Sequence, residues 1–347
     1  WITFAEALIG RTDIPAESLV PQVTSLDEMD AYEQDLPKWM GTDSSPLLHE
    51  RFPWLEIAHS IAKDQGFFHW EVEFAHAFAN GGFDLQVGNP PWVRPTWQED
   101  FVLAENDPWF ALTLHADVAA RNYRRSRLLT DARVAYGLLR ELAQTSGVTA
   151  FLGLATTYPL LLGTQPDMYR AFMCQIWRHQ TLKGTAGLIH PDTHFGGVRE
   201  GMLRQAAYLR LRIHGSFINA ANWAFQAASR SMEFGVHIYG HPQEINFLHL
   251  SQLCGAAVLA DSLKHDGTGP VPGQKHQGTW DLRPHAARAV KVDSRRLAEW
   301  HALRTTDQEA TPSLLYPITL LEERAISALA KHPVRTNSLK PWMTSGY

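Results

Sequence analysis

Residues 89–92, Asn-Pro-Pro-Trp, combine residue types that can promote chemistry on an amino group. An exocyclic amino nitrogen on a planar ring is a poor nucleophile, because its lone pair is delocalised into the ring. Two acceptors on its two hydrogens favour a pyramidal nitrogen, and the Asn89 side-chain oxygen and the Pro90 carbonyl can supply them. Pro90 and Pro91 stiffen the backbone, which preorganises these acceptors. Trp92 offers a flat face on which an extruded base can stack. The segment therefore predicts methyl transfer from a sulfonium donor to an amino nitrogen, without a metal or a covalent enzyme intermediate.

The residues before this segment predict the element that positions it. Residues 83–88, Phe-Asp-Leu-Gln-Val-Gly, are typical of a strand bounded by glycines. Two prolines cannot extend a central strand, so Asn89 is expected at the carboxyl end of one, where open α/β sheets bind ligands. Further strands are expected at residues 186–191, 211–217 and 234–239, helices at 167–180 and 197–210, and a helix-to-strand turn at 183–185. This alternation predicts an α/β fold with a mixed sheet and flanking helices.

Residues 83–92 resemble the catalytic motif of S-adenosylmethionine-dependent DNA adenine-N6 methyltransferases. Residues 67–71, followed by Phe74, look like the lead-in of large restriction-modification and phage-defence methylases, including the BREX and DISARM types. Residues 167–172 are similar to the family's helix motif after the catalytic loop, and residues 183–191 to the strand ending in proline that follows. The resemblance covers roughly residues 67 to 240.

The resemblance implies the later half of a Rossmann-like methyltransferase domain, with S-adenosylmethionine as cofactor and Phe172 against the cofactor adenine. It implies double-stranded DNA with a flipped adenine as partner, together with other defence-system subunits, in the cytoplasm. One feature departs from the family: no glycine-rich cofactor loop is found, and residues 151–155 and 254–257 are the nearest segments. We therefore expect this chain to be a segment of a longer protein that begins after that loop.

Length and composition set the domain expectation. The 347 residues suggest two domains, or one with extensions. We expect a helical connector over residues 1–66, the catalytic domain over 67–250, and an extended connector over 251–347 toward a DNA-recognition domain. Two cysteines can form at most one disulfide bond, which is too few to stabilise a fold of this size. The net charge of -5 excludes a uniformly basic surface. No apolar run reaches the roughly 18 residues of a membrane span.

Other candidate residues have competing explanations. His190, Asp192 and His194 lie close together as in a metal site, but no second His or Cys pair stands at ligand spacing, so no metal is expected. A cluster of arginines suits either phosphate contacts or a solvated face: Arg121, Arg124, Arg125 and Arg127. Three aromatic residues suit either the base pocket or the core: Tyr208, Trp223 and Phe225. Structural or surface roles are expected for the remaining candidates, His69, His76 and Asp84.

Two alternative functions remain open at this stage. N-methyltransferases that act on a protein glutamine or an RNA base also use Asn-Pro-Pro-aromatic, although the long insertion after Trp92 suits a DNA enzyme better. A catalytically idle subunit that keeps the fold to bind DNA or partner proteins is the second alternative. The missing cofactor loop favours that second reading.

Overall fold

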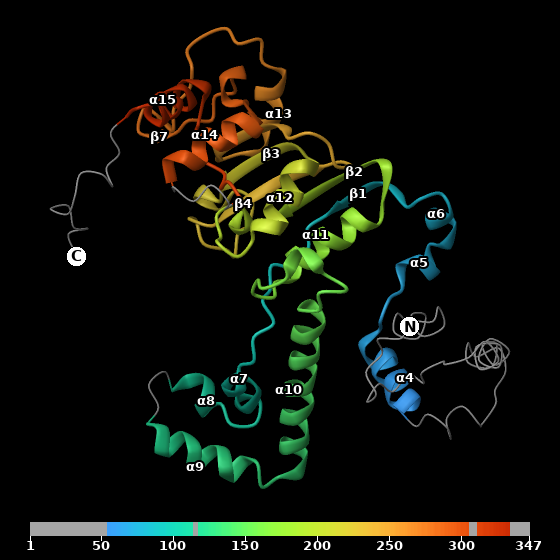
Figure 1. Cartoon of the computed structure of the whole chain (residues 1–347). Helices are drawn as coiled ribbons and strands as arrows, with labels where there is room; N and C mark the ends of the chain where they lie inside the picture. Colours follow the sequence, from blue (N-terminus) through green and yellow to red (C-terminus); the bar gives the residue numbers. More distant parts are fainter. Residues whose placement is uncertain (1–53, 114–116, 305–310, 334–347) are drawn as a thin grey trace. The chain divides into compact units, whose positions relative to one another are not determined.

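A computed structural model describes residues 54–113, 117–304 and 311–333 of the chain (Figure 1). It divides into two compact units, Trp1–Ala75 and His76–Tyr347. The boundary lies nine residues after the predicted end of the helical connector at residue 66 (75 − 66 = 9). Helix α6 (Ala75–Ala79) spans this boundary.

The described part of the first unit is helical. Helix α4 (Trp54–Gln65) lies within the predicted helical connector, and α5 (Trp70–Glu73) follows it. The rings of Phe68 and Trp70 meet edge to face with centroids 5.2 Å apart, and Trp70 stacks on Phe74 at 5.5 Å. The aromatic lead-in thus forms a local cluster around α5. Residues 1–53 of the predicted helical connector lie outside the described residues.

The second unit is built on a six-stranded mixed sheet with the order β1-β2-β4-β3-β5-β8, which confirms the predicted fold class (Figure 1). Strands β1 and β2 are parallel, as are β3 and β5, and the other neighbours are antiparallel. The strands span β1 Phe83–Gly88, β2 Gln180–His190, β3 Leu211–Ile218, β4 Glu233–Tyr239, β5 Asn246–Leu253 and β8 Val290–Asp293. Strands β6 (Lys275–His276) and β7 (Thr279–Trp280) form a separate two-stranded ladder.

Helices lie along the sheet and follow the predicted alternation. The main ones of this unit are α11 Met168–Arg178, α12 Gly201–Arg210, α13 Ala256–Lys264, α14 Ser294–Arg304 and α15 Leu320–Ala330. One core cluster joins α11, α12 and α14 to the sheet through residues such as Met173, Leu203 and Trp300. A second core cluster joins α13 to the opposite face through Phe217, Phe234 and Val258. Helices therefore cover both faces of the central strands, because side chains on opposite faces of β3, β4 and β5 enter different cores.

The described residues of the long insertion after Trp92, residues 94–146, are largely helical. They hold α7 Glu99–Ala104, α8 Trp109–Leu112, α9 Val118–Leu128 and the start of α10 Ala132–Leu152. Asp117 and Asp131 accept from the backbone N–H groups of Ala120 and Arg133, which caps α9 and α10 at their N-termini. A small core around Leu103, Phe110 and Leu138 holds the helices together.

Three sequence expectations are corrected by the structure. Residues 183–185 lie inside β2 rather than in a turn, because Gly184 allows a close approach: a Cβ there would lie 2.7 Å from the Phe83 carbonyl oxygen. Helix α12 begins at Gly201, four residues later than expected. The described part of residues 251–347 adds α13, β8, α14 and α15, so the sheet-bearing unit extends past the predicted boundary at 250.

Candidate active site

Asn89 lies at the carboxyl end of β1, as its sequence context predicts. The strand ends at Gly88, which pairs with Leu188 of the parallel strand β2. Asn89 is exposed and Pro90 is buried, so the prolines turn the chain away from the sheet while the asparagine faces solvent. A polar side chain with two acceptor lone pairs thus stands on a fixed backbone at the ligand-binding edge of the sheet.

Trp92 is tied to the neighbouring strand. Its indole N–H donates to the carbonyl of Ile189 at 3.2 Å, one residue before the end of β2. Its ring meets Phe225 edge to face with centroids 5.5 Å apart, and it lies 6.2 Å from Phe234 in a tilted arrangement. The half-buried tryptophan therefore has one side in the aromatic core, and stacking of a base on its remaining surface stays a prediction.

The loop after β3 brings Phe225 to Trp92, and its organising residue was not found from the sequence. Asn219 is fully buried; its side-chain amide donates to the carbonyls of Phe225 and Ser229, and its side-chain oxygen accepts from the N–H groups of Ala224 and Phe225. A buried asparagine that satisfies four backbone groups fixes the loop. Its position directly after a predicted strand is the one signal that the sequence offers.

The three aromatic candidates separate in the structure. Phe225 contacts Trp92, and Trp223 packs on Phe217 and Phe234 while its side chain remains half exposed. Tyr208 instead lies fully buried in the main core, where its hydroxyl donates to the carbonyl of Pro312. The structure therefore brings Trp223 and Phe225 to the carboxyl edge and removes Tyr208 from the candidate base pocket.

The chain that follows Trp92 docks on the start of α11. The N–H of Met168 donates to the carbonyl of Val93 at 3.0 Å, and Arg94 pairs with Asp167 at 3.1 Å. Burial raises the pKa of Asp167, and the hydrogen bond from Arg94 offsets this only in part. Phe172, one helical turn beyond Met168, is 42% exposed. Its aromatic face is thus accessible near the segment that follows Trp92, and a cofactor contact stays a prediction.

Strand β1 is an edge strand of the sheet in the described residues, which corrects the expected central position of Asn89. Leu85 and Val87 point to the face that carries Ile189 on β2, and they are 67% and 78% exposed. Edge strands of natural proteins usually carry charged residues or prolines that prevent pairing with another chain. The described chain therefore leaves both an unpaired strand edge and an apolar face directly beside Asn89.

The rings of His190 and His194 lie close together, with centroids 5.3 Å apart, but the histidines that approach Asp192 most closely are two others. Asp192 turns toward His214 on β3 and His237 on β4, whose Nε2 atoms each lie 3.1 Å from Asp192 Oδ1. His190 instead approaches the hydroxyl of Tyr239 at 3.2 Å. Burial alone would raise the pKa of Asp192, but the two imidazoles outweigh it and hold this pKa well below its usual range. Burial lowers the pKa of His237 to about 4.

The candidate phosphate-binding arginines lie on α9, and three of them have partners within the protein. Arg121 pairs with Glu99 and Asp100, and Arg125 also pairs with Glu99. Arg124 pairs with Asp107. These ion pairs connect α9 to α7 and to the residues before α8. They favour the structural interpretation of the cluster over a phosphate-binding surface.

The remaining sequence candidates have local roles. His69 precedes α5 as its N-cap residue, and the carbonyl of His76 accepts from the Asn80 side chain at 2.8 Å. Asp84 accepts from the Thr181 hydroxyl at 3.0 Å, which agrees with a structural acid at the strand edge.

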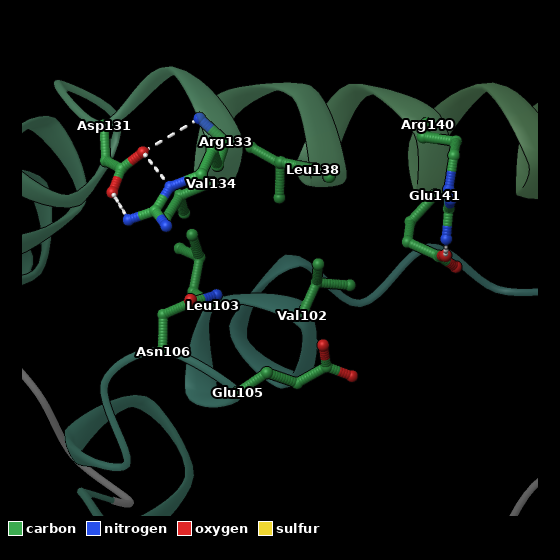
Figure 2. Close-up of a pocket in the computed structure, with 11 residues that line it drawn as sticks. Val102, Leu103, Glu105, Asn106, Asp131, Arg133, Val134, Leu138, Arg140 and Glu141 are labelled. Atoms are coloured by element: carbon green, nitrogen blue, oxygen red, sulfur yellow. Dashed lines mark hydrogen bonds and ion pairs between the residues drawn. The ribbon is translucent and has the colours of Figure 1, made fainter.

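A pocket of about 340 Å³ lies apart from Asn89, between α7 and α10 (Figure 2). Leu103, Val134 and Leu138 form part of its lining, and Asp131 is held by Arg133 through paired hydrogen bonds. Arg140 also lies 3.8 Å from Glu141 in this pocket. Residues 89–92 are not part of its lining.

Residues 26–108 match the family described as Eco57I restriction-modification methylase, a span that includes β1 and Asn89. No curated protein matches the chain. The chain thus resembles the restriction-modification methylases over the segment that carries the Asn-Pro-Pro-Trp motif.

Solved structures with partial similarity belong to restriction-modification systems. A type I methyltransferase subunit from Streptococcus thermophilus is 13% identical with a TM-score of 0.26, over 49% of this chain and 26% of that one. A modification subunit of a putative type I restriction enzyme from Vibrio vulnificus YJ016 is 9% identical with a TM-score of 0.28, over 48% and 34%. The chain thus spans about a third or less of each of these proteins.

No helix in the described ranges combines the length and apolar character that a membrane crossing requires.

Proposed function

We propose that this chain carries the target-base half of a DNA adenine-N6 methyltransferase that uses S-adenosylmethionine. The observation that supports this most directly is the position of Asn89, exposed on a rigid proline turn at the carboxyl end of β1. The match of residues 26–108 to a restriction-modification methylase family includes this turn and supports DNA as the substrate.

The proposed role of the turn is to make an amino group nucleophilic. The side-chain oxygen of Asn89 and the carbonyl of Pro90 each accept one hydrogen from the target nitrogen, which frees the nitrogen lone pair. Because Pro90 is buried and β1 is paired with β2, the acceptors need little reorganisation as charge develops. Trp92, held by Ile189, forms the flat wall against which the base is placed.

The described residues do not fit the whole cofactor. Phe172 offers an accessible aromatic face, but no glycine-rich turn adjoins Asn89 in the ranges that the structure describes. Asp192, the acid just past the end of β2, is already engaged by His214 and His237. No cofactor-dependent step is therefore assigned to this chain alone. Its proposed role is to bind the target base and to activate the amino group of that base.

A substrate comparison tests the proposal. The protein that contains this chain in full is incubated with methyl-labelled S-adenosylmethionine and, in separate reactions, adenine-containing duplex DNA, RNA and a glutamine-rich peptide. The proposal predicts label in DNA, recovered as N6-methyladenine by mass spectrometry of the digested duplex. Label in RNA or peptide alone would instead assign the site to one of the other N-methyltransferases.

A catalytically idle scaffold is the second candidate, favoured by the absence of a cofactor loop from the described residues. Calorimetric titration of the same full protein with S-adenosylmethionine distinguishes the two. Saturable binding supports the enzyme, whereas DNA binding without cofactor binding supports the scaffold.

A further inference from the structure

One carboxylate and two imidazoles converge inside the second unit, close to the carboxyl end of β2. Asp192 follows β2, His214 lies on β3 and His237 on β4. One potential ligand atom from each of these residues lies within 4.8 Å of the others. Both histidines are fully buried, and the Asp192 side chain is 12% exposed. Donor atoms from three separate segments thus meet at one point.

The two imidazoles approach Asp192 differently. Nε2 of His214 lies 3.1 Å from both carboxylate oxygens. Nε2 of His237 lies equally close to Oδ1, yet it is not aligned for an N–H···O hydrogen bond and has no other partner in the described residues. In a tetrahedral site with metal–ligand distances of about 2.0–2.2 Å, the ligand atoms are separated by roughly 3.3–3.6 Å, and their lone pairs aim at the ion rather than at each other. The pair of His237 Nε2 and Asp192 Oδ1, at 3.1 Å and without hydrogen-bond alignment, lies close to this arrangement.

The surroundings of the cluster are dense and polar. The ring of His190 stacks on that of His237 with centroids 3.7 Å apart, and His194 lies 5.9 Å from His237. His194 is fully buried, and neither of its ring nitrogens has a hydrogen-bond partner in the described part of the chain. A Cβ at Gly235 would lie 2.2 Å from Asp192 Oδ1, so only glycine fits there. Burying this many imidazoles around one acid is costly unless something compensates for the lost hydration.

We propose that Asp192, His214 and His237 bind a divalent transition-metal ion, with Zn²⁺ as the favoured ion. Imidazole nitrogen is a preferred ligand of Zn²⁺ and a poor one for Mg²⁺ or Ca²⁺, which select oxygen. An ionised carboxylate and a neutral imidazole are the forms in which these side chains bind a metal ion. The ion would tie the loop after β2 to β3 and β4, a structural role that is independent of methyl transfer.

The proposal fixes the proton positions along a chain of rings. Nδ1 of His214 lies 2.9 Å from Nδ1 of His249, so one of these nitrogens carries the proton. With a metal on Nε2, His214 carries its proton on Nδ1 and donates to His249. Without a metal, His214 donates through Nε2 to Asp192, and His249 becomes the donor to His214. The two states therefore differ in the tautomer of both rings.

Metal titration of the intact chain tests the site. The protein is treated with a chelator, checked for retained structure by circular dichroism, and titrated with Zn²⁺ or with Co²⁺ as a coloured substitute. We expect one ion per chain and a metal–nitrogen distance of about 2.0–2.1 Å by X-ray absorption. On metal binding, the imidazole ¹⁵N chemical shifts should show that the proton of His214 has moved from Nε2 to Nδ1. Asp192→Asn and His237→Gln should each weaken binding by about 100-fold or more, since even outer-shell changes cost 10–100-fold.

His285→Gln is the matched control, because His285 is also buried but lies outside the cluster and is expected to leave metal binding unchanged. If a cluster variant fails to fold, the wild-type data decide alone. Folded wild-type protein that binds no stoichiometric ion, or that keeps the Nε2 proton of His214 in saturating Zn²⁺, would overturn the proposal. Unchanged affinity in folded Asp192→Asn would do the same.

Discussion

The indole N–H of Trp92 donates to the backbone carbonyl of Ile189 at 3.2 Å, which joins the loop after β1 to the end of the parallel strand β2. This one bond makes the Asn-Pro-Pro-Trp turn part of the sheet edge rather than a free loop. It also places Trp92 between the two main cores, since the ring packs against both. The position of Asn89 therefore depends on packing at Trp92 as well as on its own strand.

Replacing Trp92 with phenylalanine should remove the hydrogen bond to Ile189 while keeping an aromatic ring against Phe225. We expect the free energy of unfolding to fall by about 1 kcal/mol, the usual value of one neutral hydrogen bond, plus a smaller packing loss. Urea denaturation measures this change. Trp97→Phe, in the separate helical core of α7–α10, is the comparison substitution. An unchanged unfolding free energy for Trp92→Phe would show that the bond to Ile189 does not hold the turn.

The open face of β1 can be tested with one substitution made at two sites. Val87→Thr should change the free energy of unfolding by no more than about 0.5 kcal/mol, because Val87 is 78% exposed. Val292→Thr on β8 buries a hydroxyl in the core and should cost about 1–3 kcal/mol. Equal losses at the two positions would mean that the face around Val87 is covered in the folded chain.

Sequence reasoning located the strand that carries Asn89 because a β-rich run followed by two prolines has few other structures. It also predicted the mixed sheet, since the alternation at β3 and β4 is regular. It missed β5 and β8. Strand β8 has only four residues, Val290–Asp293, which are too few for a periodic signal. It also placed Asn89 on a central strand, because the sequence of a strand does not state how many neighbours it has.

The Asp192 cluster shows a second limit of the same kind. Local spacing drew attention to His190 and His194, which lie within two residues of Asp192. The imidazoles that reach the carboxylate are His214 and His237, 22 and 45 residues away (214 − 192 and 237 − 192), and they are brought in by the pairing of β3 with β4. Only the strand register could have grouped them.

Cys174 should be unreactive in the folded protein. Burial raises the pKa of its thiol to about 12, so about one thiol in ten thousand is ionised at pH 8. A disulfide reagent such as DTNB should therefore label Cys254, which is partly exposed, at least tenfold faster than Cys174. Cys174→Ser assigns the slow phase, and both thiols should react at once in denaturant. Rapid labelling of Cys174 in the native protein would contradict its burial on the core-facing side of α11.

The isolated 347-residue chain should bind S-adenosylmethionine weakly. Its one candidate contact, the exposed face of Phe172, is worth about 1–3 kcal/mol by analogy with base stacking. This corresponds to a millimolar dissociation constant or weaker. Isothermal titration calorimetry of the chain measures the constant directly, with Phe172→Ala as the variant that should abolish residual binding. A micromolar value would reveal a cofactor loop within this chain.

The central claim is that the Asn89 side chain accepts a hydrogen from the target amino group. In the protein that carries this chain in full, Asn89→Ala should lower labelled-methyl incorporation into adenine-containing duplex DNA about a hundredfold or more, by analogy with removing one oxyanion-hole donor. Asn89→Asp keeps an acceptor oxygen and should retain measurable activity, while both variants should unfold at the wild-type denaturant midpoint because Asn89 is exposed. Wild-type turnover in folded Asn89→Ala, read as N6-methyladenine per minute, would contradict the account.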